Sequence, residues 1–550
     1  MKTIKKPFFV VILLILSSIP GMAQIKRPKL VVGIVVDQMR PDYLTRFYDQ
    51  FGDGGFKKLM SDGFTMWNIH YNYIPTYTGP GHASIYSGTT PRYHGIVGND
   101  IYYRDSKKSE YCVNDTFMVV GNVLTEQGKG MSPRKMIATN ICDELKLCTN
   151  NQSKVISISL KDRAAILSGG HSADYALWFD QKTGNFVTSS YYANQLPSWV
   201  VAFNDRNLAF SYINEKWTPL FASGYYSDCV TDTTSCAISK TGEKVLPLFP
   251  HYLQLPLNSK DAKYSLLFKS PLANTLLTDL AIDAIKNGDL GKGKNPDFIA
   301  ISYSSTDVVG HLYGPLSKEI KDTYLRLDQD LGRLIKTLDQ TIGEGNYVLF
   351  LTADHGIPES PQYLADHKIP AGYLYHKPLI KLASDFLETK LSAGKWVDTL
   401  MNDQFFLNRK LISEKGLDLK AVQTQLANYL MQQKGIAFAY TASEMNETEF
   451  TIGTGMCVQN GFQPKLSGDV LIVMEPGYFE YEDGYLVEHG SGYNYDTHVP
   501  LIWYGQNINK GESWQLHYIT DIAPTLSMIL RIKYPDACIG NPITEVTSQK

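Results

Sequence analysis

The sequence predicts an α/β protein, a three-layer sandwich with a mostly parallel central sheet and large insertions. Apolar runs typical of buried strands recur along the chain, at 30–36, 155–160, 175–179, 298–303, 347–352, 470–474 and 500–504. Helical patterns lie between some of them, at 133–147, 321–340 and 520–530. Strands that alternate with helices are typical of a parallel sheet covered on both faces.

Two of the helical patterns carry a specific signal. Ser132 precedes Pro133 and is the expected cap of the first helix. Leucines and isoleucine at helical spacing give 321–340 a broad apolar face.

Two long segments, near 181–270 and 357–468, break the alternation, and the second contains a further helical pattern near 418–434. We expect both to be insertions on one domain that spans 24–550. Because loops at strand ends commonly carry function, these insertions are expected to shape substrate access.

The N-terminus has the pattern of a secretory signal peptide, 1–23. Three lysines precede the apolar run 8–16, and small residues at 21–23 suit cleavage before Gln24. Nine apolar residues are too few to span a bilayer, so no membrane anchor is expected after cleavage. The protein is therefore expected to be secreted, with the periplasm as its compartment.

Composition narrows the function further. The formal net charge is −3 and 19% of residues are charged, which gives no reason to expect nucleic-acid binding. The seven cysteines include Cys229 and Cys236, which flank a short loop and are the easiest pair to bridge. An odd count leaves at least one thiol outside intrachain pairs.

Acids and histidines follow the predicted strands. Ligands of an open α/β sheet gather beyond the carboxyl ends of its strands, so these side chains are expected to meet. Three Asp and three His suit two divalent cations, with zinc favoured and manganese or iron less so. Any one pair alone is more often a surface turn. The residues are Asp37, Asp307, His311, Asp354, His355 and His489.

Thr78, in the segment Thr-Gly-Pro-Gly-His, is the candidate nucleophile. Pro80 suits the first position of a helix, which would place Thr78 at the helix N-terminus. A hydroxyl needs a base or a metal to become a nucleophile. The alternative is a plain N-cap threonine. His82 and His94 are expected to be structural.

Lys161 and Arg163 follow the strand 155–160. In a continuation of that strand, alternate residues lie on one face, so the two side chains are expected to point the same way. Two cations there would clamp an anion; the alternative is an exposed charged turn. Asn99, in Gly-Asn-Asp, would donate an amide hydrogen bond to the same anion, unless it is an ordinary turn residue.

In their order along the chain, these motifs resemble the alkaline phosphatase superfamily, and within it the PafA-type bacterial alkaline phosphatases, with nucleotide pyrophosphatase/phosphodiesterases as relatives. The resemblance implies an alkaline-phosphatase-like fold and two Zn²⁺ per chain. One zinc would be bound by Asp37, Asp354, His355 and the Thr78 oxygen. The other would be bound by Asp307, His311 and His489, with His498 competing for the last position. Asn99, Lys161 and Arg163 would hold the phosphoryl oxygens.

The sequence thus predicts a secreted phosphomonoesterase that acts on small phosphate monoesters through a phosphothreonine intermediate. One alternative is a phosphodiesterase or nucleotide pyrophosphatase with the same core. The other is a non-catalytic, metal-stabilised binding protein. Lys161 and Arg163 favour the monoester, because a monoester is close to a dianion and a diester is a monoanion. The sequence does not fix the oligomeric state.

Overall fold

The computed structural model describes residues 27–121, 125–126, 130–231, 237–238, 244–245, 248–256, 259–482 and 484–547. The predicted signal peptide and Cys236, and with it the Cys229–Cys236 pair, lie outside these residues. Within the described ranges, none of the helices has the length and apolar character needed to cross a membrane.

The centre of the fold is a block of five parallel strands. Their order is β15 (Tyr347–Thr352), β1 (Leu30–Val36), β14 (Asp297–Tyr303), β7 (Val155–Ser159) and β8 (Tyr175–Asp180). Every residue of β1, β14 and β15 is buried. This burial explains why these strands are continuous apolar runs in the sequence rather than alternating ones.

Further strands extend both sides of this block, and the sheet has twelve strands among the described residues. β22 (His498–Gly505) runs antiparallel to β15 and to β2 (Phe64–His70), and β9 (Asn185–Ser189) runs antiparallel to β8. The chain enters β22 beside the carboxyl end of β15, where the Gly356 N–H donates to the Asp496 carbonyl at 2.7 Å. A strand that starts at this edge must run against the parallel ones.

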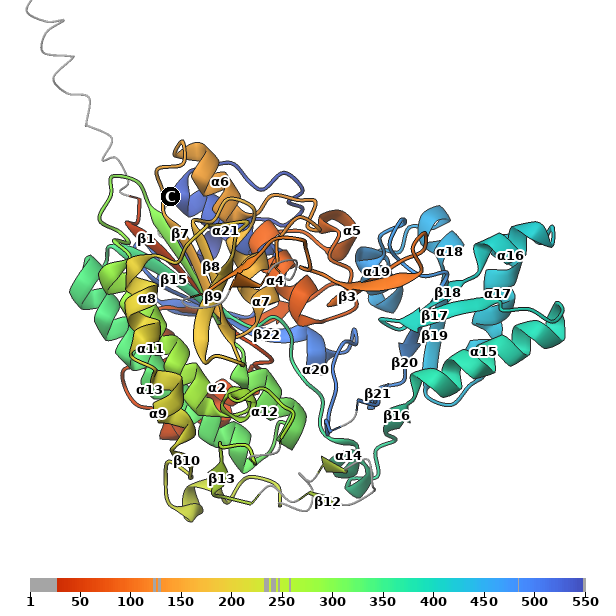
Figure 1. Ribbon diagram of the computed structural model, residues 1–550, viewed down its shortest axis with the longest axis horizontal. Helices are drawn as coiled ribbons and strands as arrows, with labels where there is room; N and C mark the ends of the chain where they lie inside the picture. The colour runs from red at the N-terminus through yellow and green to blue at the C-terminus, as the bar shows by residue number, and fades with distance from the viewer. Residues whose placement is uncertain are drawn as a thin grey trace, which may run out of the picture.

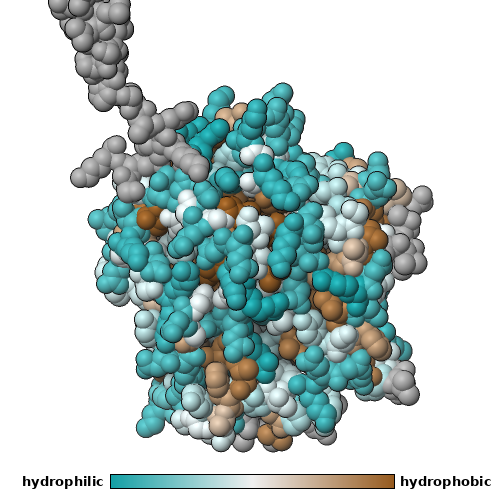
Figure 2. All heavy atoms as spheres, turned by 90° about the vertical axis from the view of Figure 1, so that its left-hand side faces the viewer, coloured by the Kyte–Doolittle hydropathy of each residue, from teal (hydrophilic) through white to brown (hydrophobic). Residues whose placement is uncertain are grey.

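Helices cover the two faces of the sheet (Figure 1). α11 (Pro271–Asn287) and α13 (Lys318–Leu338) lie on one face. α4 (Thr78–Ser87), α7 (Asp162–Gly169) and α21 (Ile522–Leu530) lie on the other. Figure 2 shows that the outer surface on the α11 side is mostly hydrophilic, with scattered apolar side chains. The predicted three-layer, mostly parallel architecture is confirmed.

The helix predicted over 133–147 is wrong in its first half. Residues 133–140 form turns and extended chain, and the helix α6 spans Ile141–Cys148. Asn140, not Ser132, is its cap: the Asn140 side chain accepts from the Asp143 N–H, and the Asp143 carboxylate accepts from the Asn140 N–H. This reciprocal pair satisfies the free N–H groups of the first turn. The other two predicted helices are observed as α13 and α21.

A second, smaller sheet lies beside the central one, at the right of Figure 1. Its order is β17 (Val397–Met401), β18 (Gln404–Leu407), β20 (Val470–Met474) and β19 (Ile436–Thr441), and all its pairs are antiparallel. α15 (His376–Lys390) and α17 (Leu419–Leu430) pack on it around a separate apolar core. The predicted strand 470–474 therefore belongs to this sheet and not to the central one.

The predicted insertions overlap these elements in different ways. β9 lies within 181–270 and pairs with the central sheet, whereas β17, β18 and β19 lie within 357–468 and pair in the smaller one. The division of the chain into a domain and two insertions stays a prediction.

Candidate active site

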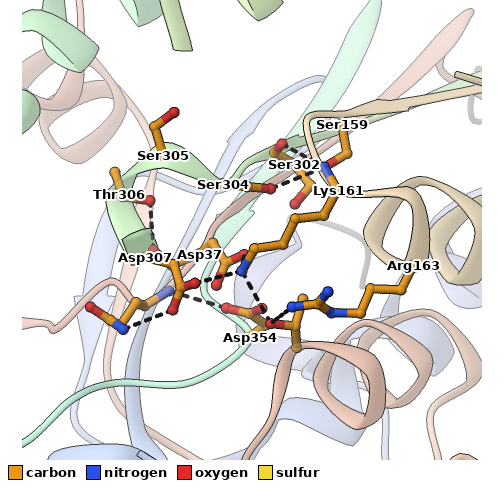
Figure 3. Close-up of polar contacts among 12 residues, drawn as sticks. Asp37, Ser159, Lys161, Arg163, Ser302, Ser304, Ser305, Thr306, Asp307 and Asp354 are labelled. Carbon is orange, nitrogen blue, oxygen red and sulfur yellow. Dashed lines mark hydrogen bonds and ion pairs between the residues drawn. The ribbon is translucent and has the colours of Figure 1, made fainter. Parts of the chain in front are cut away.

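The three acids converge beyond the carboxyl ends of the parallel strands. Asp37 directly follows β1, and Asp354 follows β15 by one residue. Asp307 lies in the first turn of α12 (Ser305–Tyr313), which follows β14. All three side chains are buried. Figure 3 shows them facing one another at this edge of the sheet.

Asp37, Asp354 and His355 form the first group of potential metal ligands. One ligand atom from each lies within 4.8 Å of the others. Asp37 Oδ1, Asp354 Oδ2 and His355 Nε2 are buried, and none has a hydrogen-bond partner among the described residues. Unpaired buried polar atoms are costly. Three of them aimed at one place are what a bound cation would satisfy, so these residues fit a metal.

Asp307, His311 and His489 form the second group. His311 Nε2 lies 3.1 Å from Asp307 Oδ1, and His489 Nε2 lies 3.7 Å from the same oxygen. The Nδ1 atoms of the two histidines are 2.7 and 2.8 Å from the carbonyl oxygens of Val487 and Thr76. Backbone carbonyls thus engage Nδ1 and leave Nε2 of each ring directed at the acid, as in metal sites.

The electrostatics of the centre reflect this crowding of acids. Burial raises the pKa of Asp37 well above its usual value, and the nearby Asp307 and Asp354 raise it further. Burial raises the pKa of Asp354 to about 6 and lowers that of His355 to about 4. A neutral imidazole is the form of histidine that binds a metal.

Lys161 is the internal counter-charge of the acids. Its Nζ lies 2.7 Å from Asp37 Oδ2 and 2.6 Å from Asp307 Oδ2 (Figure 3). Burial opposes its charge, but the two carboxylates outweigh that effect and raise the pKa of Lys161. The ammonium is therefore held charged at the centre of the site.

Thr78 faces the cations rather than capping its helix. It is the first residue of α4, and Tyr77 occupies the cap position. Pro80 is the third helical residue and not the first. Thr78 Oγ1 lies 3.3 Å from both Lys161 Nζ and Arg163 Nη2. The plain N-cap alternative is wrong.

The sequence predicted that Lys161 and Arg163 continue a strand, and this prediction is wrong. Lys161 is the cap of α7 and Arg163 is the second residue of that helix. The start of the helix still directs both side chains at Thr78 Oγ1. Lys161 is only 8% exposed, so the alternative of an exposed charged turn is wrong.

Asn99 lies on the other side of Thr78. Its Oδ1 accepts from the Gly79 N–H at 2.9 Å, which fixes the amide plane and directs the NH₂ group away from that contact. Thr78, Asn99, Lys161 and Arg163 all line one cavity of about 1090 Å³. Trp178, Phe179, Phe268 and Tyr485 add apolar surface to the same cavity.

Sequence reasoning missed several residues that hold this site. Gln38 has a left-handed backbone (φ +68°), and its Nε2 donates to Asp307 Oδ1 at 2.7 Å while its N–H donates to Asp354 Oδ1 at 3.2 Å. Tyr111 OH accepts from Arg163 Nη1 at 3.1 Å. Gln38 adjoins Asp37, which was a usable signal, whereas nothing near Tyr111 in the sequence marks it.

The remaining histidines lie outside the acid cluster or serve it structurally. His82 contacts the Thr78 carbonyl and Ser302 Oγ, and His94 contacts Ser84 Oγ. His498 lies in β22, bonds the Trp67 carbonyl at 2.7 Å and stacks on His70. The structure therefore brings His489, and not His498, to the acids.

Residues 31–494 match the family described as type I phosphodiesterase / nucleotide pyrophosphatase. The chain belongs to this family. Among its relatives, the alkaline phosphatase PafA of Elizabethkingia meningoseptica is 39% identical over 95% of each chain. The alkaline phosphatase PhoV of Synechococcus elongatus is 38% identical over 95% of this chain and 93% of its own.

A solved structure gives the same result. The crystal structure of wild-type PafA matches with a TM-score of 0.89 and 38% identity, over 95% of this chain and 99% of that chain. The predicted resemblance to the PafA-type alkaline phosphatases is confirmed.

Proposed function

We propose that this alkaline phosphatase hydrolyses phosphate monoesters through a covalent phosphothreonine intermediate on Thr78, at a centre that holds two zinc ions. The observation that carries the proposal is the position of Thr78 Oγ1. It lies 3.3 Å from both Lys161 and Arg163, in one cavity with Asp307, His311 and His489.

The metal part of the proposal rests on the two ligand groups. Asp37, Asp354, His355 and the Thr78 oxygen would hold one zinc, and Asp307, His311 and His489 would hold the other. The unpaired buried atoms of the first group support this assignment. When bound, such ions stabilise an alkoxide and a leaving-group oxygen as Lewis acids.

The chain's own residues carry the remaining steps. Thr78 Oγ gives up its proton to solvent and attacks phosphorus, a new O–P bond forms, and the ester O–P bond breaks in line with it, so that the leaving group departs as an oxyanion or takes up a proton from water. Lys161, Arg163 and Asn99 hold the phosphoryl oxygens as charge develops on them. Water then attacks the phosphothreonine and releases phosphate and Thr78.

Diester hydrolysis is the second candidate, because the matching family includes phosphodiesterases and the cavity has apolar walls that suit a second ester group. We favour the monoester because Lys161 and Arg163 supply two cations for the near-dianion.

The test is the pair of kcat/KM values for an aryl monoester and an aryl diester, together with metal analysis. We expect about two zinc ions per chain and a faster monoester reaction. We also expect loss of turnover on chelation and its recovery with zinc. Full activity in metal-free protein would overturn the mechanism, and a faster diester reaction would favour the second candidate. An inactive but metal-stabilised protein would point to the non-catalytic alternative.

We also propose export of the chain to the periplasm after cleavage of residues 1–23. N-terminal sequencing of the periplasmic fraction should find a chain that starts at Gln24. A full-length chain in the cytosolic fraction would contradict it.

A further inference from the structure

A second cluster of potential metal ligands lies between the small sheet and the catalytic cavity. It consists of His376, the first residue of α15, Asp403 in the β17–β18 turn, and Glu480 at the end of β21 (Tyr478–Glu480). One ligand atom from each lies within 4.8 Å of the others. We call this group the junction cluster.

Asp403 has a buried carboxylate oxygen, Oδ1, without a hydrogen-bond partner, and the described residues place no lysine or arginine beside it. Burial raises the pKa of Asp403 to about 7, Glu480 raises it in the same direction, and His376 opposes them. Nearby Asp469 shows the usual solution for a buried acid, because Arg104 and Arg409 each donate to it at 2.8 Å.

His376 and Glu480 are directed at the same point. His376 Nε2 lies 2.9 Å from Glu480 Oε2, yet this nitrogen makes no hydrogen bond in the described part of the chain. The two side chains are 29% and 33% exposed. Glu480 lines the catalytic cavity and also a small cavity of about 30 Å³, which Asp403 and Tyr77 line as well. Ions and water can therefore reach the cluster, and the small cavity has room for a water molecule.

We propose that His376, Asp403 and Glu480 bind a divalent transition-metal cation of the Zn²⁺ or Mn²⁺ type. Two carboxylates and one imidazole suit these ions. Ca²⁺ and Mg²⁺ prefer oxygen ligands alone, so the histidine argues against them. A cation there would satisfy the unpaired Asp403 oxygen and relieve the repulsion between the two carboxylates. Water would fill the open positions.

The location gives the cation a structural role. Asn402, next to Asp403, donates from its amide to the Asp100 carbonyl at 2.9 Å, and Asp100 follows Asn99. Tyr77, which precedes Thr78, is partly buried, and the pKa of its phenol is raised by desolvation and then by Asp403 and Glu480. The site would thus tie the small sheet to the two segments that carry Asn99 and Thr78. The inference does not depend on any catalytic role of those residues.

The test measures Mn²⁺ binding to the zinc-loaded enzyme by electron paramagnetic resonance, with zinc content followed in parallel. We expect wild type to bind one Mn²⁺ per chain without losing zinc. Asp403→Asn and Glu480→Gln should each weaken this binding at least about tenfold. Glu482→Gln is the matched control, because Glu482 lines the same catalytic cavity outside the cluster and should leave binding unchanged.

Two outcomes would overturn the proposal. One is wild-type protein that binds no Mn²⁺ at millimolar concentration, which would leave the two carboxyl groups sharing a proton instead. The other is binding that survives both substitutions. Asp403→Asn keeps the shape of the side chain, and a thermal melt checks that it folds. His376→Gln gives a second variant if it does not.

Discussion

The catalytic centre and the junction cluster use the same ligand types but handle their charge differently. In the centre, Lys161 lies within 2.7 Å of Asp37 and Asp307 and compensates two of the three acids from within the chain. In the junction cluster, the described residues place no lysine or arginine in contact with Asp403. Since an uncompensated buried carboxylate is costly, the centre is partly stable by itself, whereas the cluster depends on an outside cation or proton.

The largest expected effect comes from removing the nucleophile, because we expect the reaction at the catalytic centre and not at the junction cluster. Thr78→Ala should lower kcat/KM for an aryl monoester by at least about a thousandfold, since no other hydroxyl of the described residues contacts both Lys161 and Arg163. Thr78→Ser keeps the hydroxyl and should retain part of the activity. Phosphate trapped at low pH should map to Thr78. Normal turnover by Thr78→Ala would mean that water attacks directly.

The two competing histidines give the next largest effect. His489→Ala should lose about a hundredfold or more in activity, together with part of the bound zinc, because it removes an imidazole that faces Asp307. His498→Ala is the matched control, since His498 lies in β22 and bonds the backbone carbonyl of Trp67 in β2. It should change kcat/KM by less than about threefold. Equal losses in the two variants would refute the assignment of His489.

Lys161 and Arg163 should set the preference for monoesters. Charge-assisted hydrogen bonds contribute on the order of 1.5–3 kcal/mol, so each change to Ala should slow monoester hydrolysis about ten- to a hundredfold. The double variant should lose far more on the monoester than on the diester. An unchanged ratio of the two kcat/KM values would show that these cations do not recognise the extra charge. Lys161→Ala also removes the counter-charge of Asp37 and Asp307, so its thermal stability must be measured alongside.

The catalytic centre could be predicted largely from the sequence, whereas the junction cluster could not. Asp37, Asp307 and Asp354 were predictable because each follows a buried strand closely, and parallel strands bring such positions together. His489 is instructive, because it precedes a strand rather than following one. It reaches the same edge only because β22 runs antiparallel to β15. The direction of β22 could not be predicted from its apolar run.

The junction cluster had no comparable signal. Its residues come from a helix start, a hairpin turn and a short strand that are far apart in the chain, and no buried strand of the central sheet precedes them. The strand predicted over 470–474 is observed as β20, but an apolar run alone could not reveal that it joins the smaller sheet. At 133–147 local chemistry decided: Asn140 and Asp143 form a better cap than Ser132.

The smallest expected effect concerns stability and compares two acids of the small sheet's region, the buried Asp469 and the partly buried Asp403. Asp469→Asn should lower the unfolding free energy by about 2 kcal/mol, because it removes the charge that Arg104 and Arg409 both need. The partial exposure of Arg409 keeps this figure below the range for fully buried pairs.

Asp403→Asn should be neutral or stabilising without added Mn²⁺, since it removes a charge that lacks a partner. Thermal melts of both variants, with and without Mn²⁺, measure this. Mn²⁺ should raise the Tm of wild type and Asp469→Asn but not that of Asp403→Asn. If Asp403→Asn proved as destabilising as Asp469→Asn in metal-free buffer, Asp403 would already be compensated within the chain, and the contrast between the two regions would fail.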